Sequence, residues 1–157
     1  MNRNINHSAA VNSRIGDRFV PVLLPESSYG DSYNEAKKTR SAKYLNKLQD
    51  DSIKIMDVNG NILNIESDYF EVQNLSLMIA KYALNTSFLK DEFTNYLKEV
   101  NVTTAFNLAS KYLEFSIFVQ IDVRPELIDL ANIYFNEAEQ FLEESDLNNK
   151  FGFSQRL

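Results

Sequence analysis

The chain has 157 residues, 44% of them hydrophobic, and this length and composition predict one folded domain with or without an appendage. It contains no cysteine, which excludes disulfides, thiolate nucleophiles and the usual cysteine-ligated zinc sites. The formal net charge of −6 is unevenly distributed, because residues 1–50 carry +3 and residues 51–157 carry −9.

Residues 1–29 are predicted to form an extended N-terminal arm. Its apolar run contains Pro21 and ends at Pro25; because proline restricts the backbone and lacks an N–H donor, the run is a poor central strand. Two interpretations stay open: the run packs along its own body, or it docks on a neighbouring subunit as an extended peptide. The candidate partner-binding residues of the arm are Phe19, Val20, Val22, Leu23 and Leu24.

Residues 30–50 are predicted to form a basic helix, with a cap at Asp31 or Ser32, or a linker. Cationic residues recur there at intervals of three and four, which places them in one stripe on a continuous helix. The stripe is either a solvated face or a surface for nucleic acid or an acidic partner. Because the whole chain is negative, nucleic acid is the less favoured partner. The stripe consists of Lys37, Arg40, Lys43 and Lys47.

Residues 53–65 are predicted to form a β-hairpin at the start of a compact helical domain that spans residues 51–145. Asn59 and Gly60 separate two apolar segments and suit a two-residue type I′ turn. That turn would place Met56 opposite Leu63. An isolated two-stranded hairpin is only marginally stable, so it must lie on the helices or join other strands.

Four helices are expected after Ser67. Asp68 and Glu71 form a capping pair for the first, the second begins at residues 85–87, and the third begins near Thr103 and is the most buried. Pro125 suits the first turn of the fourth helix, where its missing N–H costs no hydrogen bond. The predicted fold class is therefore mainly α with minor β: a four-helix core with a small hairpin, preceded by the basic arm.

The fourth helix is expected to have one buried side and one acidic side. Glu139 and Glu143 lie one turn apart; they form a solvated acidic face or, alternatively, share a cation or a proton. Residues 146–157 are predicted to fray into a tail, in which Phe151 and Phe153 act as a lid over the core or as a docking peptide. The residues expected on the buried side are Leu127, Ala131, Tyr134, Ala138, Phe141 and Leu142.

No motif in the sequence indicates catalysis. The only histidine, His7, lies in the arm, and there is no phosphate-binding glycine loop or nucleophile elbow. We therefore expect no enzyme activity, no cofactor and no metal site. No export signal or membrane span is recognisable, so the expected location is the cytoplasm or a virion.

The sequence indicates an assembly or adaptor subunit that docks on other protein subunits through its arm, in a homo- or hetero-oligomer. A phage virion or another multi-protein complex is the expected setting. The alternative is a small acidic inhibitor, which would bind a nucleic-acid-processing enzyme by imitating the charge of nucleic acid.

Overall fold

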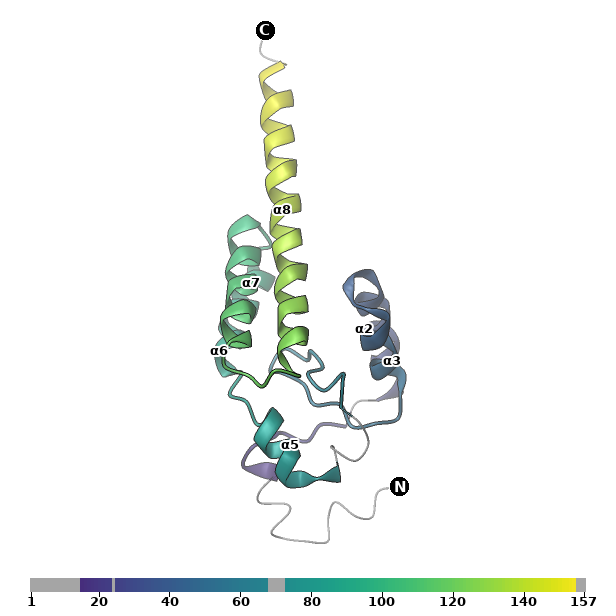
Figure 1. Cartoon of the computed structure of the whole chain (residues 1–157). Helices are drawn as coiled ribbons and strands as arrows, with labels where there is room; N and C mark the ends of the chain where they lie inside the picture. Colours follow the sequence, from purple (N-terminus) through teal and green to yellow (C-terminus); the bar gives the residue numbers. More distant parts are fainter. Residues whose placement is uncertain (1–14, 24, 68–72, 155–157) are drawn as a thin grey trace. The chain divides into compact units, whose positions relative to one another are not determined.

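The computed structural model is mainly helical, which confirms the mainly-α part of the predicted fold class, whereas the four-helix core stays a prediction (Figure 1). It describes residues 15–23, 25–67 and 73–154, without the side chains of residues 26, 27 and 146–154. The helices in this part of the chain are α2 (Glu26–Thr39), α3 (Ala42–Gln49), α5 (Leu75–Tyr82), α6 (Ser87–Lys98), α7 (Val102–Ser116) and α8 (Arg124–Ser154).

The chain divides into two compact units. The first unit consists of Met1–Ile55 and Asn64–Leu84 and contains α2, α3 and α5. The second unit consists of Met56–Leu63 and Asn85–Leu157 and contains α6, α7 and α8. The boundaries of these two units differ from those of the predicted segments, which were 1–29, 30–50, 51–145 and 146–157. The predicted segments stay a prediction.

In the second unit, α7 and α8 lie side by side, and α6 packs against α7 (Figure 1). Asn101 and Thr104 form a capping box that fixes the start of α7, close to the predicted start at Thr103. Pro125 is the second residue of α8, as expected for the first turn. The core between these helices contains Ala105, Leu108, Ala109, Tyr112, Leu127, Leu130 and Ala131.

The buried side of α8 differs from the prediction at its C-terminal end. Leu127, Ala131 and Ala138 are buried as expected, but Leu142 is 53% exposed. The reason is that α8 extends beyond the end of α7, so its later turns have no neighbouring helix within this unit (Figure 1). The helical backbone of α8 continues to Ser154, where a frayed tail was expected.

The predicted pairing of Met56 with Leu63 is wrong. The described residues contain no strand in this region, only an isolated antiparallel bridge between Met56 and Ile62. A type I′ turn needs positive φ at both central residues, but among the described residues only Gly60 has it, at φ 86°. The Gly60 N–H instead donates to the Asp57 carbonyl, and the Asp57 N–H donates to the Asn61 carbonyl. Three residues, 58–60, therefore lie in the loop, where the predicted turn had two.

The side chain of Asn64 replaces the backbone pairing that would have extended the hairpin. Its Oδ1 accepts from the Ile55 N–H at 2.8 Å, and its Nδ2 donates to the Ile53 carbonyl at 2.9 Å and to Ser67 Oγ at 3.1 Å. Asn64 is fully buried, so these bonds satisfy both ends of its amide. A side chain thus makes the contacts that a second strand was expected to make.

The single basic helix predicted within residues 30–50 is also wrong, because this segment is divided between α2 and α3. Arg40 has an extended backbone with ψ 155°, and the Ser41 side chain accepts from the Tyr44 N–H at 3.2 Å, which starts a new helix. Helix α2 begins at Glu26, earlier than the predicted cap. The predicted capping pair Asp68 and Glu71 lies outside the described residues.

We expect Asn64→Ala to lower the free energy of unfolding by about 1–3 kcal/mol, because it leaves the buried Ile55 N–H without its acceptor. Urea denaturation of the full chain measures this change. Asn132→Ala, at an exposed position on α8, is the control and should change stability by less than about 0.5 kcal/mol. Equal stability of the two variants would contradict the role given to Asn64.

Candidate functional site

The apolar run of the N-terminal arm is exposed to solvent. Val20 is 86% exposed and Leu23 is 90% exposed, and Val22 is also exposed. Phe19 is half-buried, and its N–H donates to the Ile15 carbonyl at 2.7 Å. Leu24 lies outside the described residues. The arm therefore presents aliphatic side chains to water without regular secondary structure over residues 19–23.

The prolines of the arm limit how it is able to bind another molecule. Pro21 has no N–H, so a strand made by this run lacks one donor of a hydrogen-bonded ladder. Recognition of the arm must therefore rely on insertion of side chains into an apolar surface more than on backbone pairing.

The predicted basic stripe does not form one surface. Lys37 is exposed on α2, whereas the guanidinium of Arg40 lies 4.0 Å from the centre of the Tyr44 ring, between the two helices. Lys43 forms an ion pair with Glu66, and the buried Lys47 has its Nζ 3.8 Å from Asp50 Oδ2. The break at Ser41 separates these residues, so they do not provide the continuous row of charge that phosphate contacts need.

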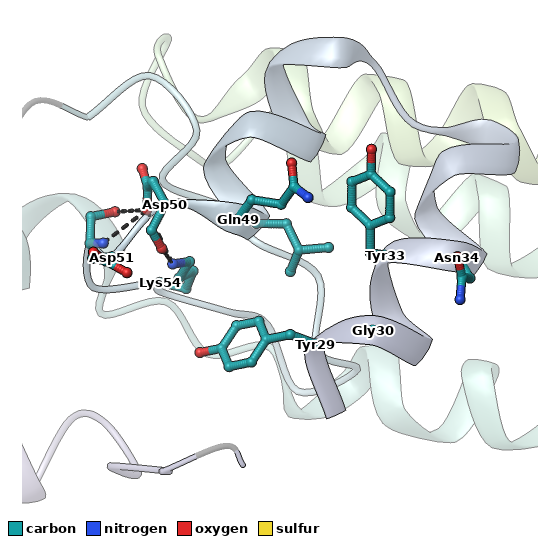
Figure 2. A pocket seen from close by; sticks show the side chains of 10 residues that line it. Tyr29, Gly30, Tyr33, Asn34, Gln49, Asp50, Asp51 and Lys54 are labelled. Atoms are coloured by element: carbon teal, nitrogen blue, oxygen red, sulfur yellow. Dashed lines mark hydrogen bonds and ion pairs between the residues drawn. The ribbon is translucent and has the colours of Figure 1, made fainter. Parts of the chain in front are cut away.

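A hollow of about 690 Å³ lies in the first unit between α2 and the segment after α3. Tyr29 and Tyr33 of α2 line one side, and Asp50 and Lys54 lie on the other (Figure 2). Lys54 Nζ donates to Asp50 Oδ1 at 3.1 Å. The Ser52 N–H also donates to Asp50 Oδ1, at 2.9 Å.

Asp50 and Lys54 of this hollow are paired with each other, and the pairing affects the chemistry of the Asp50 carboxyl. Burial would raise the pKa of Asp50, but hydrogen bonds from Ser52 and Lys54 and the charge of Lys47 outweigh it and lower the pKa below its ordinary value. A carboxyl with a lowered pKa is ionised at neutral pH and is a poor general acid. Asp50 is therefore a poor candidate for a general acid.

A buried polar cluster joins the loop 56–63 to α7 in the second unit. Tyr112 Oη donates to Asp57 Oδ2 at 2.9 Å, and it accepts from the side-chain amides of Asn59 and Asn61, both at 2.9 Å. Asp57 Oδ1 accepts from the backbone N–H groups of Asn59 and Asn61 at 2.9 Å. The Tyr112 ring stacks on Tyr134 of α8 with centroids 5.9 Å apart.

Two tyrosine hydroxyls in this unit have raised pKa values. Burial, followed by the charge of Asp57, raises the pKa of Tyr112, and burial with the hydrogen bond to Glu137 raises that of Tyr96. Tyr96 Oη donates to both carboxylate oxygens of Glu137 at 2.8 Å, which links α6 to α8. Both hydroxyls are held in the protonated form, so they are donors that stabilise the fold.

The sequence analysis did not identify the hydrogen-bond partners of Tyr112. A buried tyrosine hydroxyl needs a hydrogen-bond partner, and the polar loop from Asp57 to Asn61 is where the sequence offers several. A buried tyrosine together with a polar loop elsewhere in the sequence is therefore the pattern that could have predicted this cluster.

Glu139 and Glu143 are exposed on α8, as the prediction of an acidic face requires. The backbone of Phe151 and Phe153 is part of α8, but the structure does not describe their side chains. Within the described ranges, no group of three or more acidic or histidine side chains is placed to hold a metal ion. No helix in the same ranges is long and apolar enough to cross a membrane.

Comparisons with protein-family models, curated proteins and solved structures found no match to this chain. The exposed apolar run of the arm is therefore the candidate functional site on structural grounds alone.

We expect Tyr112→Phe to lower the free energy of unfolding by about 1–3 kcal/mol, because the buried carboxylate of Asp57 loses a donor. Urea denaturation at pH 7 measures the difference. Tyr33→Phe, at a half-buried position in the first unit, is the control and should change stability less. A loss no larger than that of the control would contradict the importance of this bond.

The stability of the protein should also fall as the pH rises above about 10. The unfolded chain releases the Tyr112 proton near its ordinary pKa of 10.0, whereas the folded chain retains it, so high pH favours unfolding. Below pH 10 this contribution is fully present. The free energy of unfolding, measured by urea denaturation at several pH values between 8 and about 11, should fall less steeply with pH for Tyr112→Phe than for the wild type. An equal dependence on pH in the two proteins would contradict the raised pKa of Tyr112.

Proposed function

We propose that the protein is a non-catalytic assembly or adaptor subunit that docks on other protein subunits through its N-terminal arm. The observation that supports the proposal is the exposure of Val20, Val22 and Leu23, which flank Pro21 and precede Pro25. The proposed setting is a phage virion or another multi-protein complex, with the cytoplasm or the virion as the location.

The energetics of the arm favour docking. Full burial of a valine or leucine side chain contributes about 1.5–3 kcal/mol, so three such side chains supply enough to offset a substantial part of the cost of association. The prolines restrict the free arm and reduce the entropy lost when it becomes ordered on a partner. A short run of this kind is therefore suited to act as a docking peptide.

A second candidate function is an acidic inhibitor of a nucleic-acid-processing enzyme. The specific observation in its favour is that Glu139 and Glu143 are exposed on α8 of a unit with 13 Asp/Glu and 6 Lys/Arg. Binding of that kind depends mainly on charge and weakens steeply with salt, whereas docking of an apolar arm depends mainly on apolar burial and weakens less. We favour the assembly function because the exposed arm has no place in the inhibitor hypothesis.

The proposal is tested by the variant Val20→Asp/Val22→Asp/Leu23→Asp of the full chain. Light scattering on a sizing column should give a multiple of 18.1 kDa for the wild type and a single copy for the variant, because charged side chains cannot enter an apolar site. Circular dichroism should show unchanged helix content, since the substituted side chains are exposed.

The matched control carries three aspartates at exposed apolar positions elsewhere, and it should assemble like the wild type. Assembly that survives the arm substitutions would contradict the proposal. Binding to a nucleic-acid enzyme that disappears at high salt, together with indifference to the arm substitutions, would favour the inhibitor. The control positions are Ile53, Leu77 and Leu97.

A further inference from the structure

The α7–α8 pair has a second apolar side that lies outside the core. On each helix the residues recur at helical spacing, so they form one row along α7 and one row along α8. Phe106 is 53% exposed and Ile117 is 67% exposed, while Ile128 and Phe135 are half-buried. We name this surface the α7–α8 face; it consists of Phe106, Leu113, Ile117, Ile128, Phe135 and Leu142.

The α7–α8 face points away from α6. Phe88 of α6 packs edge-on against Phe115 of α7, with centroids 5.2 Å apart. Phe106 lies nine residues before Phe115, which is two and a half turns at about 3.6 residues per turn, so the two rings are on opposite sides of α7. Phe106 instead contacts Phe135 of α8, with centroids 5.4 Å apart, and this contact joins the two rows.

The apolar run of the arm matches this face in length and in mode of binding. Residues 19–23, if fully extended, span about 14 Å from the first Cα to the last at roughly 3.4 Å per residue. The row from Phe106 to Ile117 rises about 16 Å along α7 at roughly 1.5 Å per residue. A helical face offers side-chain contacts and no backbone ladder, and the arm, with Pro21 at its centre, is limited to such contacts.

Charge selects the arm over a second α7–α8 face as the occupant. Residues 1–25 carry three arginines and one aspartate, a net +2, whereas the second unit carries a net −7. Two α7–α8 faces packed together would bring two strongly negative units into contact, which costs free energy. An arm on the face instead brings Arg18 to an acidic unit, and opposite charges favour that encounter.

We infer that the α7–α8 face binds residues 19–23 of a second copy of this chain. The inference rests on the proposed function, since it names the surface that receives the arm. Contact through the face buries the apolar row that α6 leaves uncovered, together with Val20, Val22 and Leu23 of the arm. Two copies that exchange arms form a closed pair, whereas a one-way arrangement forms a longer chain.

Because the chain contains no native cysteine, an introduced cysteine is able to form a disulfide only with another introduced cysteine. Leu23→Cys and Leu113→Cys are prepared as separate full-length variants, mixed, and oxidised, so that any disulfide between the two variants joins two copies. Docking brings the thiols together, and we expect on the order of tenfold more mixed dimer than in the control mixture. The control replaces Leu113→Cys with Leu97→Cys on α6, where the leucine is more exposed than Leu113 and a thiol is at least as accessible.

No excess of mixed dimer over the Leu97→Cys control overturns the inference. A disulfide that forms only within single chains of the double variant Leu23→Cys/Leu113→Cys also overturns it, because the arm then binds its own chain. The two proposals fail separately. If the arm aspartates abolish assembly but the cross-link is absent, the arm docks elsewhere and only the inference falls; if the aspartates leave assembly intact, the proposed function itself falls.

Discussion

The hydrogen bond between Tyr112 and Asp57 is the contact on which the second unit depends. It lies between a helix and a loop whose two ends both continue into the first unit. A buried carboxylate is stable only when its oxygens accept enough hydrogen bonds, and here the hydroxyl of Tyr112 and the N–H groups of Asn59 and Asn61 supply them. Because the same ring stacks on Tyr134, one residue holds the loop, α7 and α8 together.

The helices of this unit were predictable from sequence because several local signals agree there. Apolar residues at intervals of three and four mark α7 and α8, and Pro125 marks the start of α8. The hairpin was not predictable in detail, because its outcome depends on which group pairs with the backbone of Ile53 and Ile55. A buried asparagine makes those bonds, and propensity rules score Asn64 only as a turn residue. The break at Ser41 also depends on a single side-chain hydrogen bond, from the Tyr44 N–H to Ser41 Oγ, which starts a new helix. The regular spacing of the cationic residues equally favoured one continuous helix, so the break was not predicted.

The candidate site was predictable in part. An apolar run that contains one proline and ends at another is a local signal, so the arm was recognisable in the sequence. The α7–α8 face was not, because a wide apolar arc on a helix does not say which part faces its own chain. Leu142 shows the limit: its spacing places it with the buried residues of α8, yet it lies beyond the end of α7. Periodicity gives the side of a helix, and only packing shows whether another element covers it.

Charge and apolar surface have separate roles in the association that the structure suggests. Apolar burial is non-directional, so by itself it would let two exposed α7–α8 faces pack together as readily as an arm on a face. The net charge of −7 on the second unit opposes the first arrangement, while the positive arm favours the second. The charges act over a screening length of about 8–10 Å at moderate salt, which is enough to select the partner before contact. In the proposed association, the uneven charge therefore decides which surfaces meet, and the aliphatic side chains decide how tightly they stay together.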